Sequence, residues 1–191
     1  MVDLQAIHPD PASFWRRWVF STDHKVIAKQ FLWTGLAFLG LGGAFAMIIR
    51  AQWAYPESGL LSPSEYNSVF TMHGLIMIFW AITPALIGAF GNYCIPLMIG
   101  ARDMAFPKLN MLSFWTFLLS GVFIILSFFA EMGSAGAGWT TYPPLSTSVG
   151  MPGLGQSAVI FAIFLTGSAT IMGSINYVTT IVRLRAPGIG S

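Results

Sequence analysis

The sequence predicts an all-α fold, a polytopic membrane bundle of four transmembrane helices, and three observations lead to this prediction. Only 8% of the 191 residues are charged and 55% are hydrophobic, with a mean hydropathy of +0.70, whereas about 25% of the residues of a soluble domain are charged. Four apolar stretches are long enough to cross a hydrocarbon core of about 30 Å as helices that rise about 1.5 Å per residue. Glycines recur along the first two stretches, and small residues let neighbouring helices approach closely.

These stretches divide the chain into one membrane domain with no internal repeat and no soluble domain. In chain order, the expected segments are an inner N-terminal segment (1–30), the first span (31–49), an outer loop (50–67), the second span (68–99), an inner loop (100–108), the third span (109–130), an outer loop (131–156), the fourth span (157–182) and an inner tail (183–191).

Two of these segments have features that affect the architecture. The second span is longer than a bilayer requires and contains Pro84 and Pro96. Because each proline removes a backbone donor, we expect a kink and either tilt or extension beyond the bilayer. The outer loop at 131–156 contains no Lys or Arg, and it is long enough to fold back over the bundle as a lid.

The distribution of positive charge predicts the orientation of the spans. Eight of the nine Lys and Arg residues fall in segments on one side, and only Arg50 falls on the other. Positively charged loops stay inside, so the N-terminus is expected in the cytoplasm, with the spans in a bacterial plasma membrane. The net charge is +2 without a basic tract, so no nucleic-acid partner is expected, and the single Cys94 allows no disulfide within the chain.

His73 is the one imidazole inside an apolar run, and it needs a partner there: a metal, a buried polar group or a lined cavity. Arg50 ends the first apolar stretch at the same outer level, so both side chains could reach one buried ligand. A purely structural explanation stays open for each residue. His73 could make an interhelical hydrogen bond, and Arg50 could extend to the outer headgroups.

Asp103 is expected at the inner mouth of the bundle, between two helices. Small neutral polar residues lie in the inner halves of the spans and could hold a file of waters without the desolvation cost of a charge: Asn92, Asn110, Ser113, Thr170, Asn176 and Thr180. Alternatively, Asp103 forms a solvated pair with Arg102, and the neutral residues bond across helices for packing alone. Trp139 and Tyr142 fit an interfacial aromatic belt.

Several motifs, spread in order over nearly the whole chain, carry a family resemblance. They are Phe-Ser-Thr-Asp-His-Lys at 20–25, Thr-Met-His-Gly at 71–74, Gly-Asn at 91–92, the twelve residues from Pro96 to Pro107, Ser-Phe-Trp at 113–115 and the eight residues from Gly138 to Leu145. In these motifs the chain resembles subunit I of the A-type haem-copper terminal oxidases. The resemblance implies that the chain forms the N-terminal four helices of a subunit with about twelve, in an enzyme that reduces dioxygen to water and pumps protons.

The resemblance also implies a role for each candidate residue. His73 matches one axial ligand of the iron in the low-spin haem A, and Arg50 matches the arginine that bonds the haem formyl group. Trp139 matches the tryptophan near a propionate of the high-spin haem, and Tyr142 of the same motif counts among the cofactor-binding residues. Asp103 matches the carboxylate at the inner mouth of a proton pathway, and the residues above it match the water-holding positions: Asn92, Asn110, Ser113, Thr170, Asn176 and Thr180.

At some positions the chain departs from the family pattern. Ala169 and Thr170 replace two adjacent serines, Phe31 replaces a tyrosine of the proton pathway, and Gln52 replaces a glutamate that binds a structural cation, so that ion is not expected. The quinone-binding positions of quinol-oxidising members are occupied here by residues that offer a quinone few donors: Leu41, Phe45, Glu65 and Ser68. Cytochrome c is therefore the expected electron donor, and a quinol oxidase is the alternative.

The ligands of copper B and of the high-spin haem, and the second axial histidine of the low-spin haem, belong to later helices in the family. The other histidines of this chain, His8 and His24, are not expected at membrane depth, so a second ligand to the iron must come from elsewhere. We therefore expect a fragment, the product of a split gene or an incomplete subunit. Its expected partners are the remaining helices of subunit I, subunits carrying copper A, cytochrome c and lipid. A b-type membrane cytochrome and a non-catalytic scaffold remain alternatives, although a single intramembrane histidine argues against the cytochrome.

Overall fold

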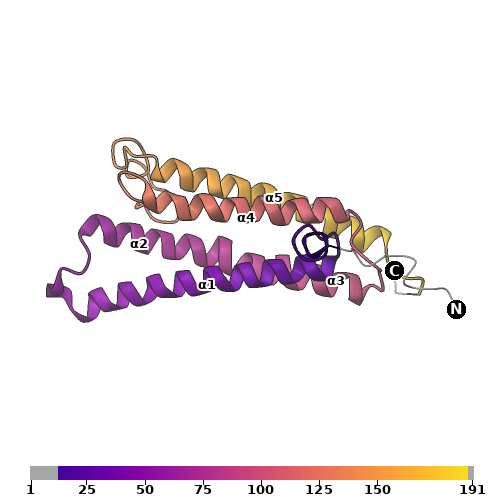
Figure 1. The fold of residues 1–191 in the computed structure, drawn as a ribbon. Helices are drawn as coiled ribbons and strands as arrows, with labels where there is room; N and C mark the ends of the chain where they lie inside the picture. Colours follow the sequence, from indigo (N-terminus) through magenta and orange to yellow (C-terminus); the bar gives the residue numbers. More distant parts are fainter. Residues whose placement is uncertain (1–12, 189–191) are drawn as a thin grey trace.

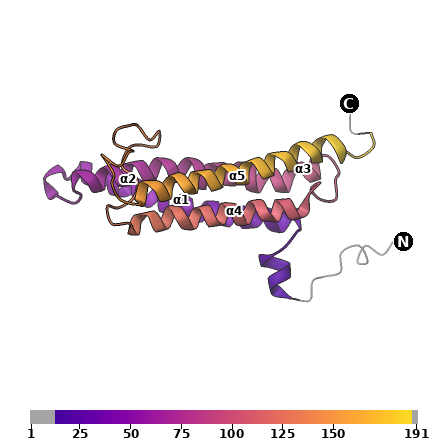
Figure 2. The ribbon, with the colours of Figure 1, turned by 90° about the horizontal axis from the view of Figure 1, so that it is seen from above.

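The computed structural model describes residues 13–188, and every long element in it is a helix (Figure 1). Four continuous helices are long and apolar enough to cross a membrane: His24–Ala54, Pro63–Met98, Pro107–Phe129 and Gly155–Arg183. They run along a common direction in an elongated bundle, as the second view also shows (Figure 2). The predicted fold class is confirmed: the chain is an integral membrane protein with four spans.

The helices extend beyond the apolar stretches from which the spans were predicted. Helix α1 (His24–Ala54) begins at His24 rather than at residue 31, because Asp23 accepts a hydrogen bond of 2.7 Å from the backbone N–H of Lys25 and so caps the helix. Helix α5 (Gly155–Arg183) begins and ends outside the expected 157–182. Hydropathy identifies the part of a helix that suits hydrocarbon, whereas backbone hydrogen bonds continue into the polar flanks.

The second long helix changes its winding along its length. It comprises α2 (Pro63–Leu75), two π-helical segments, η4 (Ile76–Ile82) and η5 (Pro84–Gly91), and α3 (Asn92–Met98). Ser62 and Glu65 form a capping box at its start. The π-helical winding surrounds Pro84, where the sequence predicts a kink, and the hydroxyl of Thr83 donates to the carbonyl of Ile78 at 2.7 Å. Wider π turns at a proline leave some carbonyls to side-chain donors.

The third long helix comprises α4 (Pro107–Leu126) and the short 3-10 segment η6 (Ser127–Phe129), and a long loop then leads to α5. This loop lies at the end of the bundle opposite the start of α1 (Figure 1). It folds against α2, because the hydroxyl of Ser68 donates to the carbonyl of Ser134 at 3.2 Å and the N–H of Gly138 donates to the hydroxyl of Thr71 at 2.9 Å. The loop therefore covers the N-terminal part of the second helix.

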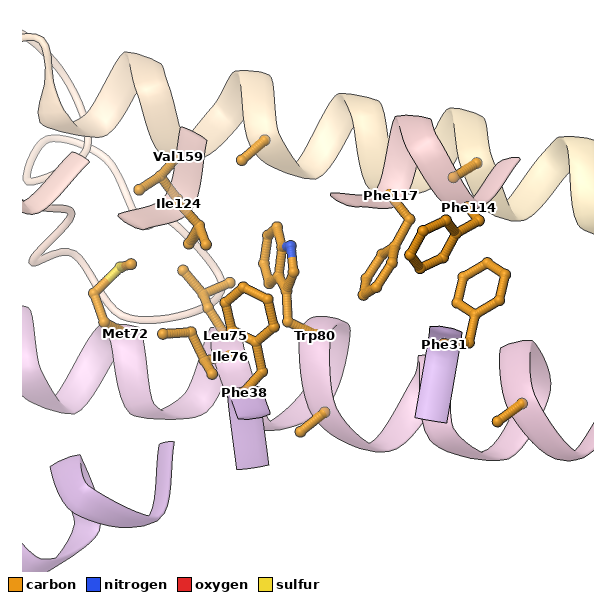
Figure 3. Packing of buried hydrophobic residues seen from close by; sticks show 14 of the residues in the cluster. Phe31, Phe38, Met72, Leu75, Ile76, Trp80, Phe114, Phe117, Ile124 and Val159 are labelled. Atoms are coloured by element: carbon orange, nitrogen blue, oxygen red, sulfur yellow. The ribbon is translucent and has the colours of Figure 1, made fainter. Parts of the chain in front are cut away.

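Aromatic side chains fill the centre of the bundle (Figure 3). Phe31 of α1 meets Phe114 of α4 edge to face, with ring centroids 5.2 Å apart, and lies 5.4 Å from Phe117. Trp80 is fully buried and donates from its indole N–H to the hydroxyl of Ser120 at 3.0 Å. The buried indole N–H of Trp80 is thus paired within the core, as an apolar medium requires.

Gly88 determines how closely α1 approaches η5, so Gly88→Ala is expected to destabilise the protein. A Cβ at this position would lie 2.6 Å from Cδ1 of Phe31, and the rings of Phe114 and Phe117 leave Phe31 little room to shift. Overpacking of about 1–3 kcal/mol should exceed the gain of about 1 kcal/mol in helix propensity. The measurement is the thermal inactivation midpoint of the complex that contains this chain. Gly40→Ala is the control, because no heavy atom lies within 4 Å of its added Cβ; equal midpoints for the two variants would contradict the packing argument.

Candidate functional site

His73 lies half-buried near the end of α2, and its ring contacts α1. Nδ1 is 2.8 Å from the carbonyl oxygen of Gly42. Because a carbonyl only accepts, Nδ1 carries the proton, and in a neutral ring the free electron pair is then on Nε2. Within residues 13–188, no side chain or backbone group bonds to Nε2. Metal-binding histidines are commonly oriented in this way, with one nitrogen tied to a backbone carbonyl and the other free for the metal.

Gly42 brings its carbonyl within reach because it has no side chain. It is buried where α1 meets the second helix, and a Cβ would lie 2.7 Å from Sδ and 3.0 Å from Cγ of Met77. The absence of a side chain lets the two backbones approach, as small residues do between membrane helices. The orientation of His73 therefore depends on this glycine.

Trp139 is the second candidate residue near His73. The bond between Gly138 and Thr71 anchors the long loop, and the Cβ of Trp139 lies 3.7 Å from the point where Gly74 would carry its own Cβ. Half of the Trp139 surface is exposed. Tyr142 is 69% exposed, and its side chain has no hydrogen bond or ring contact with any described residue. The structure thus brings Trp139, but not Tyr142, next to Gly74, the chain neighbour of His73.

Arg50 lies further out along α1 than the contact with His73. It is eight residues beyond Gly42, which corresponds to about 12 Å along a helix axis. Helix α1 continues past Arg50 to Ala54, beyond the apolar stretch that Arg50 ends. Arg50 is exposed, with its guanidinium 5.9 Å from the ring centroid of Trp53, and it forms no ion pair with the described residues.

By the resemblance, Gln52 stands in the place of a glutamate that binds a structural cation. Its side-chain oxygen accepts a bond of 3.0 Å from the N–H of Leu61, and its side-chain nitrogen is 3.4 Å from the carbonyl of Pro56. The amide thus holds the outer loop. In the part of the chain that the structure describes, no three His, Cys, Asp or Glu side chains gather as a metal site would require.

Asp103 contacts a histidine at the end of the bundle where α1 begins. Its Oδ1 is 3.1 Å from Nδ1 of His24 and also accepts the N–H of Met104 at 2.7 Å. Asp103 keeps 24% of its side chain exposed, whereas His24 is 3% exposed as the first residue of α1. His24 was set aside in the sequence analysis as too shallow, but the early start of α1 carries it to Asp103. Within the described residues, Asp103 forms no ion pair with Arg102, which was the alternative pairing. His8 lies outside the described residues.

The inner loop that carries Asp103 is fixed by α5. The amide of Asn176 accepts the N–H of Phe106 at 2.8 Å and donates to its carbonyl at 3.2 Å. The hydroxyl of Thr180 accepts the N–H of Ala105 at 2.9 Å. Both polar atoms of the Asn176 side chain are therefore engaged with backbone, and Asn176 and Thr180 hold the loop in position.

A small cavity of about 40 Å³ lies further into the bundle. At about 10–15 Å³ for each water, it has room for about three. Polar side chains from three of the long helices line part of it, and the rest of its wall is apolar; the polar residues are Thr83, Asn92, Ser113, Thr166, Thr170 and Tyr177. Oδ1 of Asn92 and Nδ2 of Asn110 are both buried without a partner among the described groups. Asn110 is three residues before Ser113, whose hydroxyl donates to the Asn110 carbonyl at 2.8 Å.

Three of the predicted water-holding residues therefore meet at one cavity: Asn92, Ser113 and Thr170. Thr83, Thr166 and Tyr177 join them, although the sequence analysis did not single them out. Thr166 is four residues before Thr170 on α5, so helical spacing could have identified it. Nothing local in the sequence distinguishes Tyr177 from a lipid-facing aromatic residue.

The comparison with known proteins gives one family and many relatives. Residues 26–191 match the family described as Cytochrome C and Quinol oxidase polypeptide I. The chain is 46% identical over 174 residues to a heme-copper oxidase subunit I+III of Aeropyrum pernix, which covers 91% of this chain and 21% of the relative. It is 46% identical over 182 residues to a cytochrome c oxidase subunit 1 of Thermostichus vulcanus, covering 95% and 32%, and 44% identical over 187 residues to the Synechocystis subunit 1, covering 96% and 32%. The chain thus spans between about a fifth and a third of the length of these relatives.

Proposed function

Because this chain belongs to the family of cytochrome c and quinol oxidase polypeptide I, subunit I of the haem-copper oxidases, we propose that it supplies one axial ligand of a low-spin haem and the inner mouth of a proton pathway. The complete enzyme is a proton-pumping oxidase that reduces dioxygen to water. The observation that carries the proposal is the bond from Nδ1 of His73 to Gly42, which leaves Nε2 as a free donor to a metal.

The residues around His73 suit a haem. His73 would hold the iron through Nε2, and a second histidine would come from the remaining helices of subunit I. Arg50 would donate to a formyl oxygen, which selects haem A, and the indole N–H of Trp139 would donate to a propionate, with Tyr142 at the outer rim. When bound, the haem accepts and passes on single electrons. The high-spin haem and copper B belong to the part of subunit I outside this chain.

The inner residues suit proton uptake from the cytoplasm. Asp103 is partly exposed and can exchange a proton with water, while His24 beside it offers a second titratable group. Above them, the amide of Asn92 and several hydroxyls line part of a mostly apolar cavity and can pass water-borne protons without holding them. Asn176 and Thr180 keep Asp103 at this mouth, and the buried Nδ2 of Asn110, which has no partner among the described groups, would serve as a further water-holding position. With the N-terminus inside, the uptake side is the cytoplasmic face of a bacterial plasma membrane.

The outer part of the bundle favours cytochrome c over a quinol as electron donor. A quinone needs hydrogen-bond donors for its carbonyls, but Phe45 packs against Phe128 with ring centroids 5.3 Å apart and Leu41 is apolar. Glu65 is engaged in the cap of α2 and Ser68 in the bond to the outer loop. Electrons would then arrive through a copper A centre in another subunit.

The test compares two donors for one purified complex that contains this chain. Reduced cytochrome c is expected to support dioxygen consumption at least about tenfold faster than a quinol, a factor that corresponds to about 1.4 kcal/mol. Equal rates would favour the quinol oxidase instead. A complex that contains haem but consumes no dioxygen would favour the b-type membrane cytochrome. A complex without haem would favour the non-catalytic scaffold.

A further inference from the structure

Tyr177 lies on α5 with its hydroxyl between two groups of the second helix. The hydroxyl accepts from Nδ2 of Asn92 at 2.9 Å and donates to the carbonyl of Ile87 at 2.6 Å. Its ring packs against Gly91, where a Cβ would lie 3.0 Å from the hydroxyl oxygen and 3.1 Å from Cζ. Two hydrogen bonds and this close packing hold the phenol in one position.

The bonds to Asn92 determine which end of its amide is free. Nδ2 also donates to the carbonyl of Gly88 at 2.7 Å, so both amide hydrogens have acceptors. Oδ1 of Asn92 is buried and has no partner in the described chain. Both carbonyls, of Ile87 and Gly88, belong to the π-helical segment η5, whose irregular winding makes them available to side chains.

We propose that Tyr177 is a positioning residue that fixes the Asn92 amide so that its carbonyl oxygen, and not its NH₂ group, is offered to water in the cavity. Tyr177 and Asn92 both line that cavity. A water bound at Oδ1 must donate to it, which orients its remaining hydrogen and electron pairs along the water file. The proposal rests on the proposed proton route through this cavity.

Loss of the hydroxyl removes one of the two bonds that hold the Asn92 amide. In Tyr177→Phe, one hydrogen of the Asn92 amide is left buried without an acceptor, because the ring stays but the oxygen is gone. Only the bond from Nδ2 to the carbonyl of Gly88 then holds the amide. Turning the amide by half a revolution gives up that bond and exchanges oxygen and nitrogen, so that the NH₂ group can donate to the cavity water. A water that accepts at this point has the opposite orientation, which interrupts proton transfer along the file.

The experiment uses the full oxidase complex in vesicles with the proton gradient collapsed. Tyr177→Phe is expected to lower turnover about fivefold, the factor that corresponds to one neutral hydrogen bond, with unchanged haem spectra. The matched control is Tyr93→Phe, next to Asn92 in the chain, because Tyr93 is 42% exposed and its hydroxyl bonds to no described residue. Equal turnover in the two variants would overturn the proposal.

A double-mutant cycle separates positioning from a general structural effect. If Tyr177 acts through Asn92, adding Tyr177→Phe to Asn92→Ala slows turnover no further. Equal slowing in both backgrounds contradicts the proposal. Gly91→Ala crowds the same phenol and is expected to reproduce the defect, so the test remains decisive if Tyr177→Phe assembles poorly.

The proton route itself is tested separately by Asp103→Asn. If that variant keeps full turnover, the proposed route fails. If it slows while Tyr177→Phe matches Tyr93→Phe, the route stands and the positioning role alone is wrong.

Discussion

His73→Ala is expected to abolish the absorption band of the reduced low-spin haem in the complex that contains this chain. A low-spin iron needs a strong ligand on each side of the ring, and alanine offers no electron pair in place of Nε2. In the wild-type chain the hydrogen bond from Nδ1 to the carbonyl of Gly42 uses the other ring nitrogen, so Nε2 is the atom available to the iron. The measurement is the reduced-minus-oxidised optical spectrum of the purified complex.

The control for this spectrum is His24→Ala. His24 is the other described histidine, and it contacts Asp103 at the opposite end of the bundle, so its loss should leave the band in place. The high-spin haem signal and the subunit composition show whether each variant has assembled. An unchanged band in assembled His73→Ala would mean that the imidazole serves only to bond α1 to the second helix. This is the interhelical hydrogen bond that the sequence analysis left open as the alternative.

The fold followed from the sequence more completely than the ends and windings of its helices. Membrane spans depend on the composition of about twenty residues, which the chain displays directly. The start of α1 depends on one capping bond, which the N–H of Lys25 donates to the side chain of Asp23, and hydropathy does not report it. The π-helical winding around Pro84 depends on how η5 fits against α1, where Gly88 meets Phe31. A proline indicates an irregularity, but its form is decided by packing.

The candidate site shows the same division between local and tertiary information. Residue type and span topology indicated Asp103 and Asn92 as residues near a proton route. Their partners could not be predicted from local sequence, because His24 is 79 positions away from Asp103 and Tyr177 is 85 positions away from Asn92. Asn176 has the residue type of a water-holding position, yet its amide is occupied by the backbone of Phe106. Depth in the membrane can be counted from the sequence, but the direction in which a side chain bonds requires the packed bundle.

Asp103→Asn is expected to lower turnover by about 10²-fold or more, the range in which a positioned proton-transfer group contributes, while the haem spectra stay unchanged. Asparagine has nearly the same shape as aspartate and keeps an oxygen for the N–H of Met104 and for His24. It has no carboxyl group to take up and release a proton. The variant therefore removes proton exchange with little change to the inner loop, which Asn176 and Thr180 hold independently.

Asp23→Asn is the matched control, because both acids lie at the inner end of α1 and the same change is made in each. Asp23 is 57% exposed and caps α1 through the N–H of Lys25, and asparagine caps a helix as well as aspartate does. Asp23→Asn should therefore retain wild-type turnover. If both variants slow equally, the cause is the loss of negative charge at this face, whereas full turnover in Asp103→Asn would place the proton route elsewhere in the complex. A large loss in Asp103→Asn alone would assign proton uptake to this carboxyl group, since capping and surface charge are then accounted for.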